Sequence, residues 1–358
     1  MIRALSPYYI TTNLAYTTPT YTVCEEYTLN IQVWDGLITQ YTGSGVNTYQ
    51  VTFKNTQGSN TINSININAM IQDYIEFRQI FPNPSMTTQT LNGYNQRWVR
   101  TFNTYDGGTT EYNVTTDFMT LGYSYGNEGK NYDDVTDGLL LKAQDYKVNR
   151  KGFFALPFEA SATSSINVSA VSSPSSELNK SFVVPSTTNS NAKVQYLWVD
   201  LNDTNEDSFV TLQIGSAPSV ILDIVNECKY TPLDVMFQNK DGAVQIFTFF
   251  KKQEESMSIT DNHFETNRGQ ASLGFHQFVR HNVQARTTLV AETGFIDEDN
   301  TEVVKQLLLS ERVWSYTDGV PSPLNIVDKS FKYKTRQNDR LISYTIKFEK
   351  SYNEINNI

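Results

Sequence analysis

Long apolar segments are missing from this sequence. No run among the 358 residues approaches the ~20 apolar residues that a helix needs to cross a bilayer, so we expect no membrane-spanning segment. The first ten residues, Met-Ile-Arg-Ala-Leu-Ser-Pro-Tyr-Tyr-Ile, also lack the long apolar stretch of a signal peptide. We therefore expect synthesis in the cytoplasm without secretion by that route.

Cysteine and histidine are scarce. Cys24 and Cys228 lie about two hundred residues apart and match no metal-binding or redox spacing. Each lies beside strand-like sequence, which favours buried free thiols, with a disulfide as the alternative. His276 and His281 are five positions apart, which is not the i, i+4 spacing of a zinc pair, and His263 completes no metal triad. We expect structural or surface roles for the histidines and no metal site.

Motifs for catalysis are also missing. The chain has no Gly-x-Ser-x-Gly sequence, only Gly43-Ser-Gly45, and no glycine-rich phosphate loop. The two carboxylates of a glycosidase need no fixed spacing, so acidic loops are candidates for carbohydrate hydrolysis, although solvated loop charge is the favoured interpretation. These acidic residues are Asp133, Asp134, Asp137, Asp200, Asp203, Glu206 and Asp207. We predict that the protein is not an enzyme and has no catalytic, cofactor-binding or metal-binding residue.

Charge is sparse and unevenly distributed. Charged residues make up 18% of the chain, whose net charge is −10. Residues 1–227 hold 12 Lys and Arg against 21 Asp and Glu, whereas residues 228–350 hold 16 against 16. A chain with this excess of negative charge does not bind a phosphate backbone through counterion release. We therefore expect no nucleic-acid partner. The neutral C-terminal third is the favoured place for packing against another protein.

The sequence predicts a mainly β, multi-domain protein, because 21 Tyr and 20 Phe accompany the low charge. In residues 226–358, Leu233–Phe237 and Val244–Thr248 alternate around a turn at 239–242, which predicts a β-hairpin with one buried face. Apolar positions predict a helix over 301–314, with Asp299 as its cap. With further strands at 331–335 and 342–348, this assembly domain is expected to be a small α+β sheet covered by one helix.

Three segments precede that domain. Residues 1–22 predict an extended arm that lies on its own domain or on another subunit. Residues 23–145 predict a β-sandwich, with strands at 27–33, 49–53 and 98–102, helical turns at 68–77, and long loops or a hairpin excursion at 103–138. Residues 146–225 predict a middle β module.

Aromatic residues in or near the expected loops of the sandwich offer a second kind of function. Stacked aromatic rings suit both glycan binding and protein interfaces, so a glycan-binding adhesin is the alternative hypothesis. For Trp34 and Trp98, a place in the core is the favoured interpretation. The candidate platform residues are Trp34, Trp98, Tyr123, Tyr125 and Tyr132.

Several short segments carry a resemblance to a known family. They are Ser6–Ile10, Leu29–Gly36, Ile71–Ile75, Glu227–Pro232, Phe237–Ala243, Phe249–Lys252, Gln306–Trp314 and Asn338–Ile346. Together they resemble tail-associated structural proteins of tailed bacteriophages that infect Bacteroidetes, including crAss-like phages. The resemblance spans nearly the whole chain, is densest after residue 226 and is weakest over 159–205.

The resemblance implies a structural virion protein, made in the host cytoplasm and located in the phage tail. It implies a ring, collar or hub-type subunit that forms a homo-oligomeric ring and contacts other tail or portal-proximal virion proteins. The quoted segments are fold-bearing, so they transfer no active site and no cofactor. We expect that removing residues 1–20 leaves the fold intact and impairs assembly.

Overall fold

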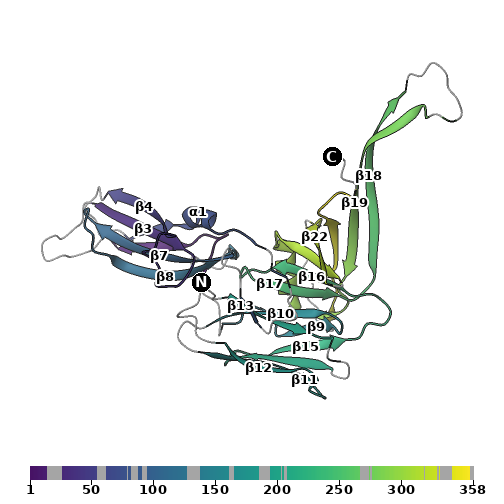
Figure 1. Cartoon of the computed structure of the whole chain (residues 1–358), viewed down its shortest axis with the longest axis horizontal. Helices are drawn as coiled ribbons and strands as arrows, with labels where there is room; N and C mark the ends of the chain where they lie inside the picture. The colour runs from purple at the N-terminus through teal and green to yellow at the C-terminus, as the bar shows by residue number, and fades with distance from the viewer. Residues whose placement is uncertain are drawn as a thin grey trace.

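The structure is a computed structural model in which β-strands dominate, as the sequence predicts (Figure 1). The strands form several separate sheets, and the two α-helices of the described residues are short. The described residues are 1–13, 26–54, 62–78, 80–81, 88–90, 95–126, 138–160, 165–184, 194–202, 204, 208–266, 274, 276–317, 319–328, 330 and 341–354.

The N-terminal part contains a five-stranded sheet in the order β1-β8-β7-β3-β4. One face of this sheet is covered by two short strands and by helical turns. Leu29, Ile31 and Val33 alternate on that face and pack with Ile67 and Ile71 in one hydrophobic cluster. The elements are β1 (Ile2–Arg3), β2 (Tyr9–Asn13), β3 (Glu26–Trp34), β4 (Asn47–Lys54), β5 (Ile62–Asn66), α1 (Asn68–Ile71), η1 (Gln72–Tyr74), β7 (Gln96–Tyr105) and β8 (Tyr112–Thr120).

Strand β8 decides between the two forms expected for the glycine-rich stretch 103–138, long loops or a hairpin excursion. Strands β7 and β8 form an antiparallel hairpin, and β8 lies inside the main sheet, hydrogen-bonded to β7 and β1. Its β-branched residues, among them Val114 and Thr115, suit a strand, whereas the glycines lie in the flanking segments. Residues 127–137 lie outside the described part of the chain.

The described part of the predicted N-terminal arm belongs to the same chain's sheets. Strand β1 pairs in parallel with β8, and β2 pairs with β5. Ile2 and Ala4 are buried in the hydrophobic cluster between the layers. Residues 1–13 therefore complete the N-terminal fold, and residues 14–22 lie outside the described residues.

The middle of the chain forms two further sheets. The middle sheet has the order β12-β11-β14-β15-β9, and a three-stranded sheet has the order β10-β13-β6. Strand β6 comes from the N-terminal part and pairs with β13, so the two parts share a sheet. The strands are β6 (Thr88–Thr90), β9 (Asp145–Asn149), β10 (Phe153–Glu159), β11 (Ile166–Ser173), β12 (Asn179–Val184), β13 (Val194–Asp200), β14 (Phe209–Ile214) and β15 (Val220–Val225).

The C-terminal part is built on a seven-stranded sheet in the order β17-β16-β21-β22-β24-β19-β18. The predicted hairpin is confirmed, because β16 and β17 pair antiparallel from Leu233 with Phe249 to Gln238 with Val244. The elements are β16 (Leu233–Gln238), β17 (Val244–Phe249), β18 (Gln253–Glu265), β19 (Phe278–Glu292), β20 (Ile296–Asp297), α2 (Asn300–Leu309), β21 (Val313–Thr317), β22 (Val320–Ile326), β23 (Leu341–Ile342) and β24 (Thr345–Lys350).

The prediction of a single buried face for this hairpin is wrong. Every residue of β16 and β17 is buried. Val235 and Phe249 pack into a cluster with Leu307 of α2, while Met236 and Ile246 on the other face pack with aromatic residues of β13. Polar residues at alternate positions mislead the sequence prediction, because Gln245 and Thr248 are buried with hydrogen-bond partners.

The predicted helix is shorter than its apolar pattern indicates. Helix α2 ends at Leu309, Ser310 is extended with ψ 131°, and Trp314 lies in β21. Asp299 makes no capping hydrogen bond from its side chain. The predicted strand at 342–348 is divided between β23 and β24, and the predicted strand at 331–335 lies outside the described residues.

One hydrophobic cluster continues across the predicted boundary between residues 225 and 226. It contains Leu212 of the middle sheet, Leu156 of β10, Phe249 of β17 and Leu307 of α2. Apolar side chains from both sides of that boundary thus share a core, which holds the middle and C-terminal parts together.

Candidate functional site

Three features of the structure are candidates for function: a buried junction, a polar pocket and a projecting hairpin. The junction is formed by the turn between β16 and β17, where Asn239, Lys240 and Asp241 are all buried. The Asn239 side-chain carbonyl accepts the backbone N–H groups of Asp241 and Ala243, each at 3.0 Å. Its amide group donates to the Leu140 carbonyl at 2.9 Å. The turn is thus held by its own first residue.

Side chains from both ends of the chain meet at this junction. Arg3 of β1 forms an ion pair with Asp241, and both side chains are buried. The Thr120 hydroxyl donates to the Asp241 backbone carbonyl at 2.9 Å. Gly242 has a φ of +78°, and a Cβ there would lie 2.8 Å from the Gly122 nitrogen. The N-terminal sheet and the C-terminal hairpin therefore contact each other through backbone and charge.

Two aromatic residues after β8 extend the junction to α2. The Tyr125 hydroxyl donates to Glu302 at 2.6 Å, and Lys305 Nζ lies 3.4 Å from the centre of the Tyr125 ring. Lys240 Nζ lies 4.5 Å from the same centre. Burial raises the pKa of the Tyr123 phenol, and the charge of Glu302 adds to that shift. These contacts fix the loop after β8 against the helix.

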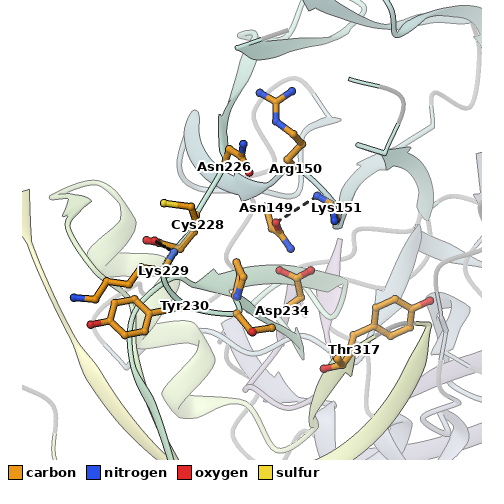
Figure 2. A pocket seen from close by; sticks show the side chains of 13 residues that line it. Asn149, Arg150, Lys151, Asn226, Cys228, Lys229, Tyr230, Asp234 and Thr317 are labelled. Carbon is orange, nitrogen blue, oxygen red and sulfur yellow. Dashed lines mark hydrogen bonds between the residues drawn. The ribbon is translucent and has the colours of Figure 1, made fainter. Parts of the chain in front are cut away.

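The pocket has a volume of about 410 Å³ and lies between the middle and C-terminal parts (Figure 2). Figure 2 shows Arg150 and Lys151 from the turn after β9, and Cys228, Lys229 and Tyr230 from the segment before β16. The wall is thus mostly polar, with charges of both signs.

Asp234 is the buried carboxyl of this pocket. It accepts a hydrogen bond from the Thr248 hydroxyl at 2.6 Å, and burial raises its pKa to about 6. A Cβ at position 152 would lie 2.7 Å from the Asp234 Oδ2 atom, so Gly152 allows the backbone to approach the carboxyl. Lys251 binds the other wall carboxyl, Glu227, at 3.0 Å. Backbone N–H donation from Lys229, with the Lys251 side chain, lowers the pKa of Glu227.

Asp234 is thus a protonatable carboxyl in the pocket wall, held from behind by the Thr248 hydroxyl. Such a carboxyl can contact a polar group, since its neutral form donates and its ionised form accepts a hydrogen bond. Among the described residues, no group of three His, Cys, Asp or Glu side chains is placed to hold a metal ion.

The projecting hairpin is formed by β18 and β19, which pair along most of their length and extend away from the body of the molecule (Figure 1). We define the arm as residues 256–266 and 276–284 of this hairpin. Its large apolar side chains are exposed, with 57% of Met257, 53% of Ile259, 48% of Phe264 and 60% of Phe278 accessible. Strand β24 pairs with β19 only over 288–292, so its pairing ends before the arm begins.

One basic residue and one histidine of the arm lie at the same carboxylate. Asp261 pairs with Arg280 and lies 3.2 Å from the His263 Nε2 atom. Asn282, with a φ of +52°, lies where the register between the strands shifts, which is the geometry of a β-bulge. All three histidines are exposed, as the surface interpretation predicts, and all three lie in the arm.

The other candidate residues of the sequence are not brought together. Trp34 and Trp98 are buried, and their indole nitrogens donate to the Leu37 and Gly36 carbonyls at 2.8 and 3.1 Å, so their interpretation as core residues is confirmed. Neither is available for stacking on a glycan. Tyr123 and Tyr125 form the junction described above, and Tyr132 lies outside the described residues.

Of the acidic loop candidates, Asp200 alone lies in the described part of the chain, and it accepts the Asn202 backbone N–H at 3.0 Å. Asp133, Asp134, Asp137, Asp203, Glu206 and Asp207 lie outside it, as does Cys24. Cys228 is a free thiol but is exposed at the pocket, so the prediction of a buried thiol is wrong for this residue. It follows the last residues of β15 in a turn rather than in a strand.

Sequence reasoning missed the arm and the pocket carboxyl. The arm was detectable, because residues 253–265 and 278–292 contain no proline, and their Ile, Val, Thr and Phe residues suit strands. Asp234 gave no such signal, since an Asp that alternates with apolar residues predicts a solvent-facing position.

Comparisons with known proteins add no family. No protein family model matches the chain, and no curated protein matches it. A solved structure, described as the crystal structure of CBD12 from CALX1.2, is similar over 59% of this chain and 76% of that chain, with 11% identity and a TM-score of 0.16. At that TM-score the similarity carries no argument about fold or function. In the part of the chain that the structure describes, no helix is long and apolar enough to cross a membrane.

Proposed function

We propose that this chain is a structural virion protein of a tailed bacteriophage, a subunit that assembles with copies of itself into a ring of the tail. The observation that supports this proposal most is the arm, a two-stranded ribbon whose apolar side chains are exposed at Met257, Ile259, Phe264 and Phe278. An isolated two-stranded ribbon has little stability in water, and a projecting apolar surface is typical of an interaction site.

The contacts between the parts of the molecule suit a subunit that keeps a fixed shape within an assembly. The N-terminal and C-terminal parts are joined at the buried junction by an ion pair, by close backbone contact at Gly242 and by the contacts of Tyr125. The middle and C-terminal parts share one hydrophobic cluster. A rigid subunit with an exposed apolar arm can make the same contact with each neighbouring copy around a symmetry axis.

Neighbouring tail or portal-proximal proteins would occupy the surfaces that copies of this chain leave uncovered. The arm belongs to the neutral C-terminal third, where no excess charge opposes contact with a second protein.

Purified particles of the phage that encodes this chain provide the test. We expect the chain in washed, gradient-purified particles at a constant ratio to the major capsid protein, and a symmetric ring of its density in cryo-electron microscopy of the tail. A cytosolic host protein of similar abundance serves as the control for contamination. Absence of the chain from intact particles, or its loss at the same washing step as the control, contradicts the proposal.

A further inference from the structure

We infer that the pocket between the middle and C-terminal parts binds a neutral sugar residue of a glycan, held by Asp234 and Asn149 (Figure 2). This site is separate from the aromatic platform that the sequence suggests, because neither Trp34 nor Trp98 lines the pocket. The inference goes beyond the proposed ring and does not depend on it.

Asp234 supplies a hydrogen-bond acceptor in the pocket wall. Only 8% of this residue is exposed, and its Oδ1 atom accepts the Thr248 hydroxyl at 2.6 Å. Within the described part of the chain, its Oδ2 atom has no hydrogen-bond partner, and its carboxyl forms no ion pair. A buried carboxylate oxygen without a partner is costly, so a ligand that donates a hydrogen bond to it is favoured.

Asn149 supplies a hydrogen-bond donor on the other side of the pocket. Its side-chain oxygen accepts the Lys151 backbone N–H at 3.3 Å, which leaves its NH₂ group as a donor. That NH₂ group has no hydrogen-bond partner among the residues that the structure describes. Figure 2 shows the side chains of Asn149 and Asp234 directed toward each other. A hydroxyl both donates and accepts, so hydroxyl groups on one ligand satisfy both side chains.

Charge in the pocket wall favours a neutral ligand. The wall contains Arg150, Lys151 and Lys229, which disfavour a cation. The buried carboxyl of Asp234 disfavours an anion, because burial raises its pKa and no neighbouring cation lowers it. Carbohydrate is the class of ligand that is uncharged and carries several hydroxyl groups on one small ring.

The size and the remaining lining of the pocket suit such a ring. The volume of about 410 Å³ lies within the range of small-molecule sites, about 300 to 1,000 Å³. Tyr230 and Tyr316 contribute aromatic ring surface to the wall, against which the C–H groups of a sugar can pack. Thr231 and Thr317 contribute further hydroxyl groups to the same wall.

Cys228 reports whether the pocket is occupied, because its thiol is exposed and lines the pocket. In full-length Cys24→Ser it is the one remaining thiol, and its reaction with Ellman's reagent is timed with D-glucose, D-galactose, D-mannose or N-acetyl-D-glucosamine at millimolar concentrations. We expect at least one of these sugars to slow the reaction about twofold at its Kd. The control combines Cys24→Ser and Cys228→Ser with Val114→Cys, an exposed residue of β8, and its rate should not change.

Two substitutions in the Cys24→Ser chain test the side chains that hold the sugar. Asp234→Asn removes the charged acceptor at nearly constant shape, and Asp223→Asn, at an exposed carboxyl of β15, is its control. Asn149→Asp keeps the oxygen that accepts the Lys151 N–H and removes the donor. We expect Asp234→Asn and Asn149→Asp each to raise the Kd of the protecting sugar at least about tenfold, and Asp223→Asn to leave it unchanged. Thermal unfolding of each variant confirms that it is folded.

Three results overturn the inference. The first is that no sugar in the panel slows the reaction of Cys228. The second is protection that persists in both Asp234→Asn and Asn149→Asp, which would place the sugar elsewhere. The third is that acetate or methylammonium, tested at equal concentration, protects Cys228 better than every sugar, which would make the ligand a charged one. The particle experiment decides the proposed ring separately in each case.

Discussion

Arg3, near the start of the chain, and Asp241, in the turn between β16 and β17, form a buried ion pair across the junction between the N-terminal and C-terminal parts. The two residues are 238 positions apart in the sequence. A buried charge without its partner is costly, so the loss of either residue is expected to destabilise the contact between the two parts.

Replacement of Arg3 by Met is expected to lower the free energy of unfolding by about 3 to 5 kcal/mol, because it leaves the Asp241 carboxylate buried and unpaired. Urea unfolding followed by circular dichroism measures this loss. Arg286→Met is the matched control, since Arg286 is exposed and pairs with Glu349 at 3.3 Å; its effect should be within about 1 kcal/mol. Equal effects of the two variants would show that the buried pair has no special role.

Gly242→Ala is expected to weaken the junction more than its backbone strain explains. A Cβ at Gly242 would lie 2.8 Å from the backbone of Leu121 and Gly122, so the two parts must move apart. Gly107→Ala is the control, because Gly107 has a similar φ of +70° with nothing within 4 Å of the added atom. Strain alone costs on the order of 1 kcal/mol, and we expect Gly242→Ala to exceed the control by at least about 2 kcal/mol. Similar thermal unfolding of both variants would contradict the close contact.

Removal of residues 1–13 is expected to destabilise the N-terminal fold, in contrast to the sequence-based expectation that residues 1–20 are dispensable for folding. Ile2 and Ala4 are buried, and β1 and β2 each pair with another strand. Limited proteolysis of the truncated chain should release the C-terminal part from a digested N-terminal sheet. A truncated chain as resistant as the full chain would restore the original expectation.

Asp234 is expected to make stability fall as pH rises from about 4 to about 6. Its pKa is raised from 3.8 to about 6 by burial, so in this interval the folded chain holds a proton that the unfolded chain releases. The loss amounts to about 3 kcal/mol at most above pH 6. In Asp234→Asn this loss is absent, so the free energy of unfolding at pH 7, taken relative to its value at pH 4, should be higher than in the unmodified chain. Asp223→Asn, which removes an exposed carboxyl of β15, should keep the pH dependence of the unmodified chain. Identical profiles for Asp234→Asn and the unmodified chain would contradict the raised pKa.

Much of the fold follows from local patterns in the sequence. Alternation at Tyr27–Val33 and around the turn at 239–242 predicts β3 and the β16–β17 hairpin, because a half-buried strand has a period of two. The second buried face of that hairpin does not follow, because Gln245 obtains its partner from Tyr146, which is distant in sequence, and Thr248 is buried as the partner of Asp234 on the opposite strand. Likewise, Trp314 continues the apolar spacing of α2 but lies in β21, where it pairs with Met236 of β16. Nothing in the local sequence indicates this strand pairing.

The candidate surfaces depend even more on tertiary arrangement. The alternation of Met257 and Ile259 with polar residues is typical of any half-buried strand, but both side chains are exposed on β18, the edge strand of the sheet. The stretch 160–191 is rich in Ser, Thr and Asn and resembles a linker by composition. Strands β11 and β12 within it nevertheless pair in a sheet, with Val168 and Ala170 in the core. Burial on one side and exposure on the other are properties of the assembled sheets.

Cryo-electron microscopy of the purified full-length chain in its assembled form tests most directly whether this is a ring-forming subunit. We predict a closed ring in which β18 and β19 of each copy contact the next copy. A chain that remains monomeric at all concentrations, and that is absent from phage particles, would contradict both the ring and its place in a tail.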